Sequence, residues 1–124
     1  LVVLFDVLID NADRWTGFNT KGSPDDRTLY FMDNTFSFST FTLGHEGNLA
    51  PLRHMEVFPR GLVERMRALT YDTIEHALDV GDDPIGPLLQ PAEIRALLAR
   101  RDHLMAYIDA QVAELGEKAV LALP

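Results

Sequence analysis

The chain has 124 residues, of which 47% are hydrophobic, no cysteine and a formal net charge of −8. A chain of this length buries one modest core, so we expect a single compact unit over residues 1–124. The lack of cysteine excludes disulfides and thiolate metal sites, and the acidic balance argues against nucleic-acid partners, which require clustered Lys and Arg.

The first ten residues are predicted to form a helix. Asp6 and Asp10 share one face of it. The apolar residues recur at helical spacing on another face: Leu1, Leu4, Phe5, Leu8 and Ile9. This run is too short for a bilayer and is interrupted by Asp6, so we expect no membrane span in this segment. Because the sequence starts directly in an apolar run without Met, we expect it to be a piece of a longer protein.

A β-hairpin is predicted after a polar loop. The stretch "SPDD" at 23–26 has the turn chemistry of a hairpin between a short strand near Thr20 and the strand "RTLYFM". Asp33 and Asn34 therefore lie at a strand end. Phe36 and Phe38, which follow, are expected to be core residues.

The remainder is predicted to be a loop followed by helices. Residues 39–59 have a loop-like pattern, and residues 60–124 are expected to form a helical subdomain. A helix, or a broken pair of helices, is expected to end at Gly81, and Asp83-Pro84 would suit the start of a short helix. The clearest helix runs from Pro91 to a stop at Gly116.

Several familiar catalytic motifs are absent from the sequence. The four histidines have no metal-ligand spacing, and the acidic loops lack the alternating ligands of an EF-hand. The sequence contains neither G-x-S-x-G nor G-x-x-x-x-G-K. The chemistry must therefore be sought elsewhere.

A set of acids and amides remains: Asp13, Asn19, Asp33 and Asn34. Phosphoryl transfer needs one carboxylate to orient the attacking hydroxyl, and an amide oxygen plus a second carboxylate to hold Mg²⁺ against the nucleotide phosphates. The order of helix, acidic loop, hairpin, acid, variable loop and helices is that of a protein-kinase C-lobe.

The stretches "FDVLIDNADRW" and "LYFMDNTFSF" resemble atypical kinases of the secretory-pathway Golgi type and their bacterial relatives. They are more distantly similar to phosphoinositide kinases and toxin-type serine kinases. The likeness implies an α+β, mainly helical fold: a kinase-like C-terminal lobe whose small hairpin carries the catalytic and metal-binding loops. In it, residues 1–38 hold the catalytic loop, hairpin and metal-binding acid, and residues 39–59 an activation-segment-like loop.

The resemblance assigns a role to each residue. Asp13 resembles the catalytic base and Arg14 the loop arginine, while Asp33, with Asn34 behind it, opens the activation segment. Asn19 and Asp33 are the implied metal ligands, and Asn19, Asp33 and Asn34 the implied cofactor-binding residues. Two departures from the family pattern are Trp15 in place of His and Asn34 in place of Phe. Asn19 lies one residue further from Asp13 than in ordinary protein kinases.

The implied function is an ATP- and Mg²⁺- (or Mn²⁺-) dependent phosphotransferase acting on a hydroxyl of protein Ser/Thr, a sugar or a lipid. Kinases bind nucleotide between two lobes, and the N-lobe with its lysine and glutamate is absent from this sequence, so we expect the fragment to be inactive without that lobe or a partner chain. Two alternatives stay open: transfer of another group, AMP or glutamate, and a pseudokinase or helical interaction module.

Each residue also has a structural interpretation. Asn11 and Asp13 are of the type that stabilises turns and helix ends. Arg14 is equally suited to a structural ion pair, and Trp15 to a packing role over the loop.

Overall fold

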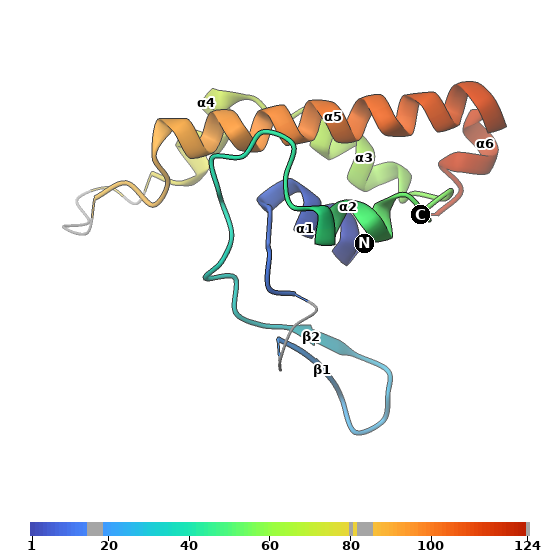
Figure 1. Cartoon of the computed structure of the whole chain (residues 1–124), viewed down its shortest axis with the longest axis horizontal. Helices are drawn as coiled ribbons and strands as arrows, with labels where there is room; N and C mark the ends of the chain where they lie inside the picture. Colours follow the sequence, from blue (N-terminus) through green and yellow to red (C-terminus); the bar gives the residue numbers. More distant parts are fainter. Residues whose placement is uncertain (15–18, 80, 82–85, 124) are drawn as a thin grey trace.

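The structure is a computed structural model that describes residues 1–14, 19–79, 81 and 86–123. It is an α+β fold, mainly helical, with one two-stranded antiparallel sheet. A long helix runs across the molecule, shorter helices pack along it, and the hairpin projects away from this helical body (Figure 1). None of the helices in these ranges is long and apolar enough to cross a membrane.

Six helices and two strands are defined in the described ranges. In chain order they are α1 (Val2–Ile9), β1 (Thr20–Gly22), β2 (Leu29–Phe31), α2 (Glu46–Leu52), α3 (Arg60–Arg67), α4 (Tyr71–Ala77), α5 (Pro91–Leu115) and α6 (Glu117–Val120). Helices α1, α3, α4 and α6 all contact α5, and α2 contacts α1.

The core lies where α1, α2 and α3 meet the middle of α5. Its centre is made of fully buried apolar side chains: Leu4, Phe58, Val63, Leu104, Ile108 and Val120. The last of these belongs to the C-terminal tail, which is docked through backbone bonds from Phe58 N to Val120 O (2.7 Å) and from Arg60 N to Leu123 O (3.0 Å). Burial of this apolar surface is the main force that holds the helices together.

The expected boundaries of the last long helix are confirmed, whereas the helix pair expected to end at Gly81 ends earlier, at Ala77. Helix α5 begins at Pro91, where the Glu93 carboxylate accepts a hydrogen bond from Gln90 N (2.6 Å), and ends at Gly116, whose φ of 88° suits glycine. The region before it is a broken pair of helices, because Thr70 and Thr73 cap α4 separately from α3. The predicted Asp83-Pro84 start lies outside the described residues.

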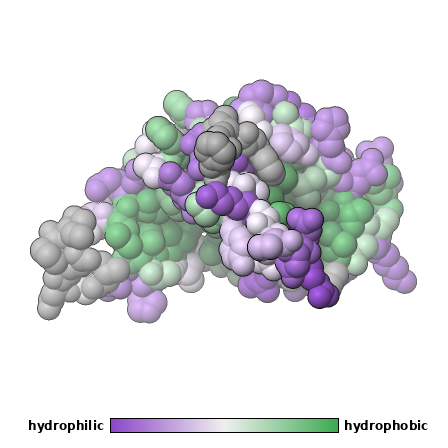
Figure 2. All heavy atoms as spheres, turned by 90° about the horizontal axis from the view of Figure 1, so that it is seen from below, coloured by the Kyte–Doolittle hydropathy of each residue, from purple (hydrophilic) through white to green (hydrophobic). Residues whose placement is uncertain are grey.

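The hairpin is confirmed, with Lys21 opposite Tyr30 and exposed. Within the described elements, its strands contact only each other. Figure 2 looks onto this side, where hydrophobic surface lies to either side of the polar turn. Leu29, Tyr30 and Phe31 are all exposed. An isolated two-stranded hairpin is only marginally stable in water.

Three expectations are wrong in detail. The buried face of α1 includes Asp6, whereas Phe5 is 45% exposed, because the Asp6 carboxylate pairs with the buried Arg14 side chain. The segment 39–59 is not only a loop, since it contains α2, which packs on α1. Phe36 and Phe38 are not core residues: Phe36 is 68% exposed, because it follows the projecting hairpin, and Phe38 is only half-buried.

Candidate functional site

Arg14 is the structural centre of the candidate site. Its side chain is fully buried, and its Nε lies 3.0 Å from Oδ2 of Asp6 on α1. Its Nη1 donates to the carbonyl oxygens of Asn19 (3.3 Å) and Met32 (2.9 Å), and its Nη2 donates to Oδ1 of Asn34 (2.6 Å). One guanidinium thus ties α1 to both ends of the hairpin.

The loop after α1 joins Asp13 directly to Asn19. The Asn19 amide nitrogen donates to Asp13 Oδ2 (2.9 Å) and to the Asp13 carbonyl oxygen (3.0 Å). Both of these bonds use the nitrogen of the Asn19 amide. The Asn11 side chain also accepts a bond from Asp13 N (3.0 Å), so the turn-stabilising role weighed from the sequence is present as well.

Asp33 and Asn34 follow β2 on the other side of Arg14. Asp33 has a φ of 52° and an exposed carboxylate that accepts bonds from the Thr35 hydroxyl and from Thr35 N (3.0 Å). These bonds, the hydroxyl's first, hold the pKa of Asp33 below its ordinary value. Asn34 Oδ1 accepts from Arg14 and from Asn11 Nδ2 (3.1 Å), so its oxygen is engaged within the protein.

Backbone bonds hold the two acid-bearing segments side by side. Met32 N donates to Asn19 O (2.9 Å), so the residue before Asp33 lies beside Asn19. Further along, Ala12 N donates to Phe36 O (3.1 Å) and Phe38 N to Ile9 O (2.6 Å). The loop that contains Asp13 and the segment that contains Asp33 therefore lie next to each other in the structure.

A second buried polar cluster anchors the next segment. Asp10, at the left-handed end of α1, accepts bonds from His45 N (2.7 Å) and from the Ser39 hydroxyl. Arg100 of α5 donates through Nε to Leu8 O (3.0 Å) and through Nη1 to Ser39 O (3.0 Å). Burial lowers the pKa of Arg100, and the charge of Asp10 opposes that shift. Together they fix residues 39–45 against α1 and α5.

The side chains fit a hard divalent cation in chemical type. Mg²⁺ prefers carboxylate and amide oxygens, which Asp33 and Asn19 offer on adjacent segments. The Thr35 hydrogen bonds lower the pKa of Asp33 and so favour its carboxylate form. Within the described ranges, no three His, Asp or Glu side chains form a metal-binding group, so the predicted pair would need further oxygens from a nucleotide or water.

The structure thus brings together Asp13 with Asn19, and Arg14 with Asn34. Burial of Arg14 favours its structural interpretation over a direct contact with phosphate. The Asp33 carboxylate takes part in neither of these contacts and accepts hydrogen bonds from Thr35 instead. Trp15 lies outside the described residues.

Sequence reasoning missed the partners of this site, above all Asp6. The available signal was the pair of acids four residues apart in an otherwise apolar helix, since a buried carboxylate requires a partner. Asp6 pairs with Arg14, and Asp10 accepts hydrogen bonds from the Ser39 hydroxyl and from His45 N.

Comparisons with family models, with curated proteins and with solved structures found no match to this chain.

Proposed function

We propose that this chain is the C-terminal lobe of an ATP- and Mg²⁺-dependent phosphotransferase that acts on a hydroxyl of protein Ser/Thr, a sugar or a lipid. The observation that carries the proposal is the set of bonds from Arg14 to Asn19 O, Met32 O and Asn34 Oδ1. They hold the loop that contains Asp13 beside the segment that contains Asp33, and phosphoryl transfer needs acids on two such neighbouring segments.

Each side chain then has a separate role. Asp13 accepts the proton of the acceptor hydroxyl and orients it for attack. The oxygens of Asn19 and Asp33 hold the metal ion. When bound, Mg²⁺-ATP supplies the transferred phosphoryl group and the neutralising charge. Arg14 acts as a positioning residue, because its buried guanidinium sets the spacing between the two segments.

The exposed hairpin supports a two-part nucleotide site. Besides Leu29, Tyr30 and Phe31, the neighbouring Met32 and Phe36 are exposed, although large apolar side chains are usually buried. We propose that an N-lobe, or a partner chain in its place, covers this surface and completes the site. The chain on its own would then be inactive.

The test uses the protein with its nucleotide-covering lobe and compares Asp13→Ala with Asp33→Ala. Asp33→Ala removes a metal ligand, so both nucleotide affinity in Mg²⁺ and turnover should fall. Asp13→Ala leaves the metal site intact, so turnover should fall by about 10²–10⁴-fold while nucleotide affinity stays near the parental value. The measurements are titration with a nucleotide analogue and single-turnover transfer.

Asp25→Ala is the matched control, because it removes an exposed acid in the hairpin turn. Mass analysis of the product separates phosphate transfer from transfer of AMP or glutamate. Parental transfer by Asp13→Ala would make Asp13 a turn residue only and would overturn its assignment. No transfer of any group by the parental protein would leave the interaction-module alternative.

A further inference from the structure

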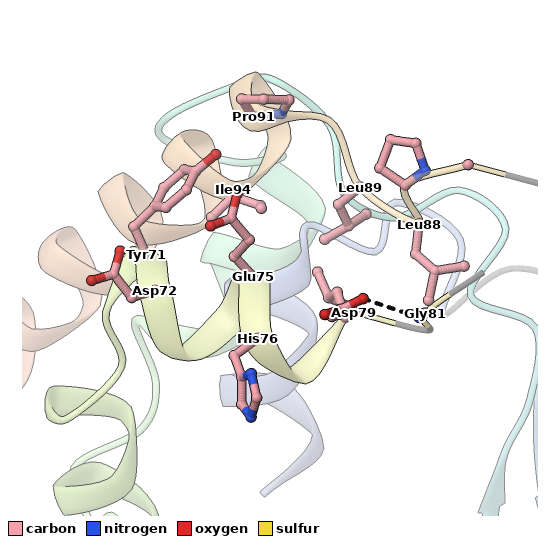
Figure 3. A pocket seen from close by; sticks show the side chains of 13 residues that line it. Tyr71, Asp72, Glu75, His76, Asp79, Gly81, Leu88, Leu89, Pro91 and Ile94 are labelled. Carbon is pink, nitrogen blue, oxygen red and sulfur yellow. Dashed lines mark hydrogen bonds between the residues drawn. The ribbon is translucent and has the colours of Figure 1, made fainter. Parts of the chain in front are cut away.

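A large cavity lies away from the candidate site. It has a volume of about 620 Å³ and lies between α4 and the segment that leads into α5 (Figure 3). Ligand pockets usually measure about 300–1,000 Å³, so this cavity is large enough for a ligand group. A second cavity, among α1, α2 and α5, is about 150 Å³ and falls below that range.

The inner wall of the cavity is apolar. Ile94, on the first turns of α5, is buried, and Leu78 and Leu89 are half-buried beside it. Leu88, at the edge, is 53% exposed. An apolar side chain entering the cavity would remove this surface from water, which favours binding.

The outer wall carries carboxylates along α4. Asp72 and Glu75 lie three residues apart on α4 and so share one face of the helix, and Asp79 follows two residues after the helix ends. In Figure 3, Glu75 extends toward Ile94. Asp79 accepts a bond from Gly81 N (3.0 Å).

The charge of this wall is uncompensated. Lys and Arg are missing from the described residues that line the cavity, and within the described ranges Asp72 and Glu75 have no ion pair. Among exposed acids on other helices, Glu46 pairs with Arg53 and Asp109 with Arg67, whereas Glu64 and Glu114 have no ion pair within the described residues. The cavity therefore suits a cationic occupant.

We propose that this cavity docks a basic, amphipathic polypeptide segment of a partner protein. An apolar side chain of the partner enters between Leu78, Leu89 and Ile94, and flanking Lys or Arg side chains pair with Asp72 and Glu75. Two carboxylates on one helix face match charges repeated along a peptide, whereas a small amine offers only one. The proposal is independent of phosphotransfer, because docking requires no catalysis.

The test is a binding measurement on the chain itself by fluorescence anisotropy. The probe is a short labelled peptide with central leucines flanked by arginines. The double variant Asp72→Asn/Glu75→Gln should bind it about tenfold more weakly, because each exposed ion pair contributes up to about 1 kcal/mol. Leu88→Ser should also weaken binding. Glu114→Gln, which neutralises an exposed acid near the far end of α5, should bind like the parental chain.

Two altered probes test each half of the recognition. Citrulline in place of arginine, or serine in place of leucine, should reduce affinity at least about tenfold. Equal binding by the double variant and by Glu114→Gln would show only general attraction to an acidic chain and would overturn the proposal. Absence of peptide binding to the parental chain would also overturn the proposal, as would competition by octylamine at the same concentration as the peptide. Circular dichroism checks that each variant is folded.

Discussion

Arg14 Nε lies 3.0 Å from Asp6 Oδ2, and both side chains are almost completely withdrawn from solvent. The pair joins the first helix to the loop that carries Asp13. Its burial distinguishes it from the ion pair between Arg53 and Glu46, whose side chains are 57% and 70% exposed. Water screens the exposed pair but not the buried one.

Asp6→Asn should therefore destabilise the chain by about 3–5 kcal/mol, because it leaves the Arg14 charge buried without its counter-ion. Arg53→Gln, which breaks the exposed pair, should cost less than about 1 kcal/mol. Urea unfolding of the two variants and the parental chain measures the difference. Similar costs for the two substitutions would mean that Arg14 does not depend on Asp6.

Thr35→Val should raise the pKa of Asp33 toward its ordinary value, because the hydroxyl hydrogen bond is the main cause of the lowered pKa. The native pKa lies below 3.8. These hydrogen bonds therefore stabilise the folded state fully at pH values above the ordinary pKa of Asp33. Their contribution is lost as the pH falls through the lower native pKa. Carboxyl-carbon NMR titration measures this shift. Thr28→Val, in the hairpin, is the control, and an unchanged Asp33 pKa in Thr35→Val would contradict the assigned cause.

The ends of the elements could be predicted better than the faces they bury. Pro91 and Gly116 mark α5 because they act through their own backbone restrictions, which need no tertiary information. The buried face of α1 depends instead on Arg14, which lies beyond the helix in the sequence. An apolar stripe alone therefore predicted Phe5 as buried and missed Asp6.

The exposed position of the hairpin predicts that two phenylalanines differ in their contribution to stability, a difference that the sequence alone did not indicate. Phe36→Ala should change the free energy of unfolding by less than about 0.5 kcal/mol, because the ring is 68% exposed. Phe58→Ala should cost about 3–5 kcal/mol, because that ring is fully buried in the core. Thermal or urea unfolding compares the two. A large cost at Phe36 would show that the hairpin packs on the helices in solution.

The candidate site shows the same division between local and distant information. The positions of Asp13, Asn19 and Asp33 in turns and at a strand end could be predicted, because such positions follow from local sequence. The hydrogen bonds that set their geometry could not be predicted, because Arg14 joins residues 5 to 20 positions away from it. Physical contact between such segments depends on how the hairpin folds back on α1.

Metal binding to the chain itself provides the last prediction. Mn²⁺ should bind weakly and broaden the NMR signals of Asn19 and Asp33 first, because their oxygens form the proposed ligand pair. Asp33→Ala should abolish this local effect. Calorimetry with Mg²⁺-ATP should detect no tight binding, because the proposed nucleotide site needs a covering lobe or partner chain to complete it.

The matched control is the double variant Asp25→Asn/Asp26→Asn, which removes two acids from the exposed hairpin turn. Its broadening at Asn19 and Asp33 should equal that of the parental chain, because turn acids are not proposed ligands. Equal broadening of the turn and of Asn19 in the parental chain would mean that Mn²⁺ follows general negative charge. In that case the pair of Asn19 and Asp33 has no selective affinity for a divalent cation, and the proposed metal site is wrong.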